Sequence, residues 1–226
     1  MKNSPKHLEN RNTISLIRLL VGWFLQLIYH QFSWAYDLVA WTVSLGRWKA
    51  WVYSVIPYLH ASTILELGHG PGYLLLALSQ AGKHCIGLDL SKQMGTKAMR
   101  KLRHHNLSPS IIRARSQQLP FTHDSIPQVV TTFPSEYIGE ADTLTEIYRI
   151  LVPGGSATIL LAAWITGKKV LDRLAAWLFN VTGESLVWKD HFLDPARSIG
   201  FSAQSEYIFF PTSKLLLVHL TKPEEP

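Results

Sequence analysis

ILELGHGPGYL at residues 64–74, together with CIGLDLS at residues 85–91, decides the fold. The first run is apolar and leads through an acid into three alternating glycines, and the second is apolar and reaches Asp89. A strand, a glycine-rich turn, a helix and a second strand are typical of a nucleotide-binding β-α-β unit. Glycine has no Cβ, so the turn can approach a ligand closely. Asp89, after the second strand, could accept hydrogen bonds from a ribose.

The glycine spacing separates two classes of cofactor. Dinucleotide-binding turns follow G-x-G-x-x-G, whereas this turn follows G-x-G-x-G and has Tyr73 at the position that would complete the dinucleotide pattern. Glu66 precedes the turn, where a carboxylate would oppose a pyrophosphate and favour a cation. S-adenosylmethionine has a ribose, a positive centre and no phosphate, and therefore fits better. A nicotinamide oxidoreductase is the less favoured assignment.

The sequence resembles the class I S-adenosylmethionine-dependent methyltransferases, and most of all the group that includes the quinone-biosynthesis methyltransferases. The resemblance covers residues 32–162 well. It extends to QQLPF at residues 117–121, which resembles the loop that covers the adenine, and to PGG at 153–155, which resembles the approach to the fifth strand. It implies a transferase that uses S-adenosylmethionine and has the Rossmann-like methyltransferase fold.

Apolar runs alternate with helical patterns along the chain, which predicts an α/β fold. We expect a doubly wound, mostly parallel seven-stranded sheet with an N-terminal helical extension, the extension taking residues 1–58 and the S-adenosylmethionine-binding domain residues 59–226. The resemblance implies a third strand and its loop at residues 111–121. Further along, the pattern predicts a fourth strand at 128–133, a helix at 141–151, a turn at 153–155 that stops this helix and a strand at 157–161. Two antiparallel strands at 201–211 and 214–220 complete the expected sheet.

The resemblance also implies which residues hold the cofactor. A Tyr-Asp pair ahead of the domain closes over the methionine end in the family, which makes Tyr36 a candidate, although it could equally cover the sheet edge. Arg115 stands where the family has an acid that accepts from the adenine amino group, and arginine can only donate. Its effect on binding stays open. The expected cofactor-binding residues are Tyr36, Glu66, Gly68, His69, Gly70, Gly72, Asp89, Leu90, Ser116, Gln117 and Thr132.

The chemistry of methyl transfer asks little of side chains, because the sulfonium already carries the leaving group and positioning provides most of the acceleration. A phenol, enol or acidic carbon acceptor would also need a general base. Glu136, Tyr137 and His191 are candidates, each as readily structural as catalytic, so no firm catalytic residue is assigned. No Cys/His cluster has zinc-like spacing, and we expect no metal. The acceptor, and whether its O, N, C or S atom is methylated, is not indicated.

The amino-acid composition and one apolar segment indicate where in the cell the protein is expected to lie. The chain has 226 residues, one cysteine and eight tryptophans, with 17% charged residues and a net charge of +6. A single cysteine favours a reducing compartment, hence the cytoplasm. Residues 14–29 are apolar but are interrupted by Arg18 and Gln26, which makes them a poor membrane span. This segment could pack on the domain, pack against a second copy in a homodimer, or lie in a membrane interface.

A basic segment supports the membrane interpretation. No acid occurs between Asp89 and Asp124, and such a patch would attract anionic lipid, although it could also be a solvated helix face. Nucleic acid is disfavoured because no binding module is recognised. The cations are Lys92, Lys97, Arg100, Lys101, Arg103, Arg113 and Arg115.

Taken together, the motifs and the composition predict a methyltransferase that acts on a small, apolar acceptor and lies peripherally on the inner membrane face. The alternative is a non-catalytic cofactor-binding or scaffold protein.

Overall fold

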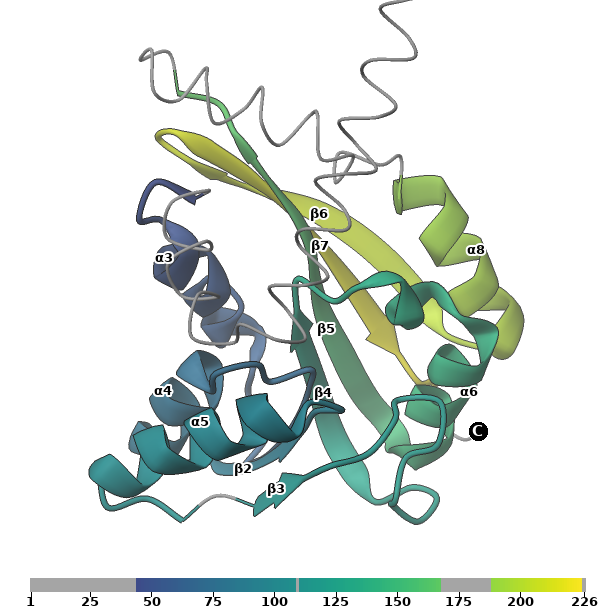
Figure 1. Ribbon diagram of the computed structural model, residues 1–226. Helices are drawn as coiled ribbons and strands as arrows, with labels where there is room; N and C mark the ends of the chain where they lie inside the picture. Colours follow the sequence, from purple (N-terminus) through teal and green to yellow (C-terminus); the bar gives the residue numbers. More distant parts are fainter. Residues whose placement is uncertain (1–43, 109, 168–187, 225–226) are drawn as a thin grey trace, which may run out of the picture. The chain divides into compact units, whose positions relative to one another are not determined.

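The computed structural model describes residues 44–108, 110–167 and 188–224. They form a seven-stranded sheet in the order β3-β2-β1-β4-β5-β7-β6 (Figure 1). The strands are β1 (Thr63–Leu67), β2 (His84–Leu88), β3 (Ser110–Ile112), β4 (Ile126–Thr132), β5 (Leu151–Ile165), β6 (Ser202–Phe210) and β7 (Ser213–Thr221). The helices are α3 (Trp48–Tyr53), η1 (Ile56–Tyr58), α4 (Tyr73–Gln80), α5 (Lys92–His104), η2 (Glu136–Gly139), α6 (Ala141–Ile150) and α8 (Trp188–Ile199).

The sheet confirms the expected doubly wound topology. β1 pairs in parallel with β2 on one side and β4 on the other, and β2–β3 and β4–β5 are also parallel. The strand order reverses beside β1, which is the point where open α/β sheets bind their ligands. In Figure 1, α4 and α5 lie on one side of the sheet, and α6 and α8 lie on the other.

β7 is the antiparallel member of the sheet, as predicted. Gly154 N–H donates to the carbonyl of Lys222, and Thr166 N–H donates to the carbonyl of Thr212, so β5 and β7 run in opposite directions. Only two residues separate β6 from β7, and so short a connection joins antiparallel neighbours. β6 therefore runs parallel to β5 at the far edge of the sheet.

The turn expected at residues 153–155 is not a helix stop followed by a new strand. β5 begins at Leu151, directly after α6, and continues for 15 residues. Its register against β4 shifts between the pairs Ile126↔Leu151 and Gln128↔Ser156, so the proline and glycines form a bulge inside the strand. Gly154 has φ +75°, and a Cβ on Gly155 would lie 2.7 Å from the carbonyl oxygen of Val152. Glycine is therefore required by the bulge.

Lys222 holds this bulge from the far end of β7. Its backbone N–H donates to the carbonyl of Gly155, and its ammonium group donates to the carbonyl oxygens of Tyr148 (3.2 Å) and Leu151 (2.9 Å). The ammonium group also pairs with Asp124 at 2.5 Å. Lys222, directly after β7, thus links the end of α6 to the start of β5 through hydrogen bonds to both.

Gln128 fixes the segment that enters β1. Its side chain is buried in β4, where it accepts from the N–H of Ala61 at 3.1 Å and donates to the carbonyl of Tyr58 at 2.9 Å. It also donates to the hydroxyl of Ser156 at 3.2 Å. A buried amide with these partners is satisfied, and it sets the position of β1 beside β4.

The chain divides into two compact units, and the nucleotide-binding elements lie in the second. The first takes residues 1–48, 164–186 and 211–213, and the second takes 49–163, 187–210 and 214–226. The expected boundary after residue 58 stays a prediction. Within the described ranges, no helix is both long and apolar enough to cross a bilayer. The N-terminal apolar segment at 14–29 lies outside the described residues.

Candidate functional site

The glycine-rich turn joins β1 to α4 and has the backbone that the motif predicts. Gly68, Gly70 and Gly72 have φ values of +66°, +52° and +77°, in the left-handed region that glycine adopts readily. A Cβ on Gly72 would lie 2.7 Å from the Cβ of Ala98, whereas one on Gly70 would meet nothing within 4 Å. Gly72 therefore lets α4 pack closely on α5, and Gly70 borders open space where a ligand could lie.

Asp89 tethers this turn to the end of β2. Its carboxylate is 4% exposed, accepting from the N–H of Gly70 at 2.9 Å and from the N–H of Ser91 at 2.7 Å. Each carboxylate oxygen has a second lone pair that could accept a hydrogen bond from a ribose. The tether to Gly70 spans 19 residues of sequence. Sequence reasoning assigned Asp89 only to the ligand and missed this structural role.

Glu66 is a buried carboxyl with unused hydrogen-bonding capacity. Its side chain is 2% exposed, and its Oε2 atom has no hydrogen-bond partner among the described residues. Burial, together with the negative charge of Asp89, raises the pKa of Glu66 well above its usual range. An unpaired buried polar group is costly. A cationic or hydrogen-bond-donating ligand at the turn would remove that cost, which fits the positive end of S-adenosylmethionine.

His69 braces the turn from inside. The ring is 3% exposed, and its Nδ1 lies 2.7 Å from the carbonyl oxygen of Gly70, which indicates that Nδ1 carries the proton and donates. Burial lowers the pKa of His69, while Asp89 acts in the opposite direction. A Cβ on Gly87 would lie 2.9 Å from its Cδ2 atom. The ring therefore fills the space that Gly87 leaves in β2.

Two of the residues expected to contact the adenine differ in whether they are available to it: Leu90 is exposed, whereas Gln117 already makes a hydrogen bond within the protein. Leu90 is 54% exposed directly after Asp89, so its side chain is open to a flat ring. Ser116 is buried. Gln117 donates to Glu140 at 2.6 Å, so its amide nitrogen is already engaged. Arg115 is exposed.

The end of β4 brings Tyr137 to the turn. A Cβ built on Gly68 would lie 2.7 Å from the hydroxyl oxygen of Tyr137, which therefore lies over the glycine. The same hydroxyl is 3.4 Å from the hydroxyl of Thr131. Thr132, the last residue of β4, is half-buried, and Glu136 is exposed in η2. Of the two catalytic candidates whose side chains the structure describes, Glu136 and Tyr137, it brings Tyr137 next to the glycine turn.

Two further candidates cannot be placed. Tyr36 lies outside the described residues. His191 belongs to α8, but its side chain is among those not described. A search of the described part of the chain finds no group of three or more His, Cys, Asp or Glu residues able to hold a metal ion.

Phe133 is a residue that sequence reasoning missed. It follows β4 with φ +50°, which is unusual for a bulky side chain, and its ring centroid lies 6.2 Å from that of Trp51 in α3. Left-handed backbone at a bulky residue persists only where the surroundings hold it, and such residues cluster at functional sites. The sequence around it, between Thr132 and Pro134, did not indicate this backbone conformation, because a bulky residue rarely adopts a positive φ and nothing in its residue type shows that it does so here.

Comparison with known proteins agrees with this geometry. Residues 64–155 match the profile of a methyltransferase domain family. This chain carries a class I S-adenosylmethionine-dependent methyltransferase domain. The match begins in β1 and ends in the bulge of β5, so it includes the turn, Asp89 and Tyr137. S-adenosylmethionine is the cofactor of this class, as the glycine spacing predicted.

Individual relatives support the same assignment for the methyltransferase domain. A methyltransferase of Mycolicibacterium gilvum, itself uncharacterised, is 30% identical over 104 residues, which cover 46% of this chain and 40% of the relative. The ubiquinone/menaquinone biosynthesis C-methyltransferase of Blochmanniella floridana is 27% identical over 189 residues, covering 80% of this chain and 73% of the relative. The match thus spans less than half the length of the mycobacterial relatives.

The fold also has close counterparts among solved structures. A protein of Methanococcus maripaludis, assigned to the S-adenosyl-L-methionine-dependent methyltransferases, superposes with a TM-score of 0.61 at 22% identity. The match covers 86% of this chain and 93% of that protein. Identity at this level shows the fold alone, and the doubly wound, mostly parallel seven-stranded sheet is the one that the sequence predicted.

Proposed function

We propose that this protein binds S-adenosylmethionine at the glycine turn and transfers its methyl group to a small, apolar acceptor of the quinone type. The observation that carries the proposal is the pair of buried carboxyls, Glu66 and Asp89, beside the open space at Gly70. Asp89 would accept from the ribose hydroxyls. Glu66 would face the positive end of the cofactor. A phosphate-bearing cofactor at the ribose position would be repelled by the carboxylate of Asp89.

The residues at the turn would act by orientation and proton transfer. S-adenosylmethionine, when bound, supplies an activated methyl group, so the protein mainly has to align the acceptor and exclude water. Leu90 would pack on the adenine. Tyr137, with its hydroxyl over Gly68, is our candidate to orient the acceptor or to relay the proton that the acceptor loses.

The quinone-type acceptor is supported by relatives and by composition. The Blochmanniella relative, which this chain resembles over most of its length, is named as a ubiquinone/menaquinone biosynthesis C-methyltransferase. Such an acceptor would be reached at a membrane surface, which fits a cytoplasmic enzyme peripheral on the inner membrane face. The net charge of +6 and the apolar residues 14–29 support that location.

Two measurements test the proposal. Calorimetric titration should show binding of S-adenosylhomocysteine and none of NAD; the reverse result would assign the chain to the oxidoreductases. Incubation with methyl-labelled S-adenosylmethionine and a reduced demethylnaphthoquinone should then yield a methylated product by mass spectrometry. Tyr137→Phe should lower the turnover while leaving S-adenosylhomocysteine affinity unchanged. Tyr148→Phe is the matched control, because Tyr148 belongs to α6, where its ring packs on Phe201, and α6 lies on the opposite side of the sheet from α4 (Figure 1).

The proposed location at a membrane surface can be tested separately. Vesicles containing anionic lipid should retain the protein, and salt should weaken the retention by screening. Removal of residues 1–30 should reduce it. Equal retention of the full and truncated chains would defeat the interfacial role of residues 14–29.

Arg115 favours one alternative, a protein that keeps the fold and binds the cofactor without catalysis. An exposed guanidinium at the adenine loop cannot accept from the adenine amino group, so binding there would be weaker than in the family. Cofactor binding without any methyl transfer to quinols, phenols or amines would support this alternative.

A further inference from the structure

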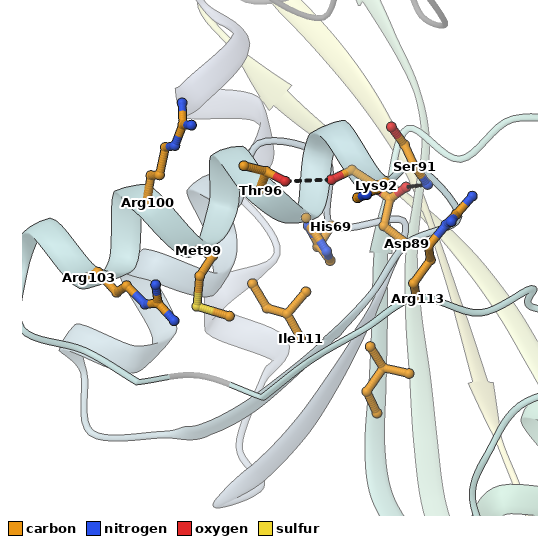
Figure 2. Close-up of a pocket in the computed structure, with 12 residues that line it drawn as sticks. His69, Asp89, Ser91, Lys92, Thr96, Met99, Arg100, Arg103, Ile111 and Arg113 are labelled. Carbon is orange, nitrogen blue, oxygen red and sulfur yellow. Dashed lines mark hydrogen bonds between the residues drawn. The ribbon is translucent and has the colours of Figure 1, made fainter.

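A cavity of about 360 Å³ lies between α5 and β3, beside the predicted cofactor site (Figure 2). It shares His69 and Asp89 with the predicted cofactor-binding residues, but Gly68, Gly70 and Leu90 do not line it. The lining comes instead from one face of α5 and from the end of β3. The cavity is therefore a second concave site, behind the carboxylate that would hold the ribose.

The lining of this cavity is strongly basic. Lys92, Arg100 and Arg103 come from α5, and Arg113 follows β3. The first three side chains are exposed, and none makes a hydrogen bond or an ion pair to any residue that the structure describes. The only carboxylate in the lining is Asp89, which already accepts from two backbone amides. Four positively charged side chains thus line one cavity, and Asp89 is the single carboxylate among the lining residues that could balance their charge.

Arg113 is held in place at the mouth of the cavity. Its Nε donates to the carbonyl of Leu90 at 2.9 Å, which leaves the two terminal nitrogens of the guanidinium for another acceptor. Figure 2 shows Arg113 beside Asp89, at the end of the cavity nearest to Ser91. Ser91 caps α5 by accepting from the N–H of Met94 at 3.3 Å, so the positive end of the helix dipole also faces this region.

The floor of the cavity is apolar. Met99 and Ile111 line it from opposite elements, and Figure 2 shows the two side chains approaching each other between α5 and β3. Arg103 lies to the left of Met99 in the same view, at the end of the cavity away from Asp89. Guanidinium groups match the oxygens of a phosphate, and an apolar floor favours a phosphate attached to an organic group over the free ion.

We propose that this cavity binds a phosphate ester, with the phosphate between Lys92 and Arg113 and the organic part against Met99 and Ile111, towards Arg103 at the other end of the cavity. The ester could be the headgroup of an anionic lipid or a small soluble metabolite, which share this chemistry. The proposal does not depend on methyl transfer, because His69 is the one lining residue that belongs to the glycine turn. Binding of a phosphate beside Asp89 would also add negative charge near the ribose carboxylate, so the two sites should influence each other.

The test uses the full chain and two probes at constant ionic strength. Titration with sn-glycerol 3-phosphate, followed by calorimetry, tests the soluble source. Sedimentation with vesicles of phosphatidylglycerol and phosphatidylcholine, against phosphatidylcholine alone, tests the lipid source. Arg103→Ala and Lys92→Ala, singly and together, should weaken whichever probe binds, with the double variant losing at least tenfold. Both side chains are exposed, so the variants should keep the wild-type melting temperature.

Arg115→Ala is the matched control. It removes the same charge from an exposed arginine close in sequence that does not line the cavity, and it should leave binding within about twofold of the wild type. Loss of binding in Arg115→Ala equal to that in Arg103→Ala would show diffuse attraction and overturn the site. Failure of both probes would overturn it as well, as would binding of a single-stranded oligonucleotide in place of either phosphate ester. S-adenosylhomocysteine affinity of the Arg103→Ala variant, measured in parallel, distinguishes failure here from failure of the cofactor site.

Discussion

Replacing Asp89 by alanine tests the cofactor site most directly, because this carboxylate serves both the ligand and the turn. Two hydrogen bonds that the carboxylate accepts from the ribose hydroxyls contribute about 1.5–3 kcal/mol each. Since about 1.4 kcal/mol corresponds to a tenfold change in affinity, the loss of even one of them should weaken S-adenosylhomocysteine binding at least tenfold. Alanine also deprives the N–H groups of Gly70 and Ser91 of their acceptor.

The structural cost of the same change should be modest. The turn borders open space at Gly70, so water can reach the released N–H groups and the loss of stability should be about 1–2 kcal/mol, below the full cost of two buried donors. For a domain of this size, that lowers the melting temperature by about 2–8 °C. Calorimetric titration well below the melting temperature therefore separates weaker binding from unfolding.

Asp142→Ala is the control for the Asp89 prediction. Asp142 is an exposed carboxylate in the first turn of α6, away from the glycine turn, so it changes the net charge equally. Its S-adenosylhomocysteine affinity should match that of the wild type. Wild-type affinity in a folded Asp89→Ala variant would refute the ribose assignment, and an equal loss in Asp142→Ala would reduce it to a general charge effect.

Three further predictions follow from the turn and its loop. Burial raises the pKa of Glu66 in the folded protein above its unfolded value, so stability is lost as the pH rises through that raised pKa; Glu66→Gln, which cannot ionise, should therefore melt increasingly above the wild type as the pH goes from about 5 to about 8 in thermal scans, and a constant difference would contradict this. Gly72→Ala should lower stability by about 2–5 kcal/mol in denaturant titrations, because its backbone has φ +77° and its Cβ would also overlap Ala98, whereas Gly70→Ala should lose only about 1–2 kcal/mol from its backbone and chiefly weaken cofactor binding; equal stabilities with unchanged binding would reject the distinction. Arg115→Asp should tighten S-adenosylhomocysteine binding about three- to tenfold by supplying an acceptor for the adenine, and unchanged affinity would mean that adenine is held elsewhere.

The sequence predicted those features that depend on local pattern. The apolar runs before Gly68 and before Asp89 became β1 and β2, because parallel strands covered on both faces need continuous apolar residues. The positive φ angles of the turn could be anticipated, because three glycines in alternation are otherwise costly. The doubly wound arrangement could be predicted because alternating strands and helices wind in both directions from a central strand.

The features that were missed depend on contacts between distant residues. Gly72 looked like a ligand glycine, but its neighbour is Ala98, on another helix. Pro153-Gly154-Gly155 looked like the end of an element, but its pairing with β4 and with Lys222 makes it a bulge. The amide of Gln117 looked available to adenine, but Glu140 engages it. The local sequence pattern does not indicate which residues from distant parts of the chain will contact a given segment.

Lys222 has a consequence for the order in which the molecule assembles. β1 to β5 are complete by Ile165, yet the outer edge of β5 is covered only by β7, whose last contacts are made by Lys222. During synthesis, β5 therefore emerges from the ribosome long before its partner, with its backbone groups exposed to other chains. Such distant pairing is slow to form. The edge of β5 therefore stays unpaired until the last strand of the chain has been synthesised and has folded against it.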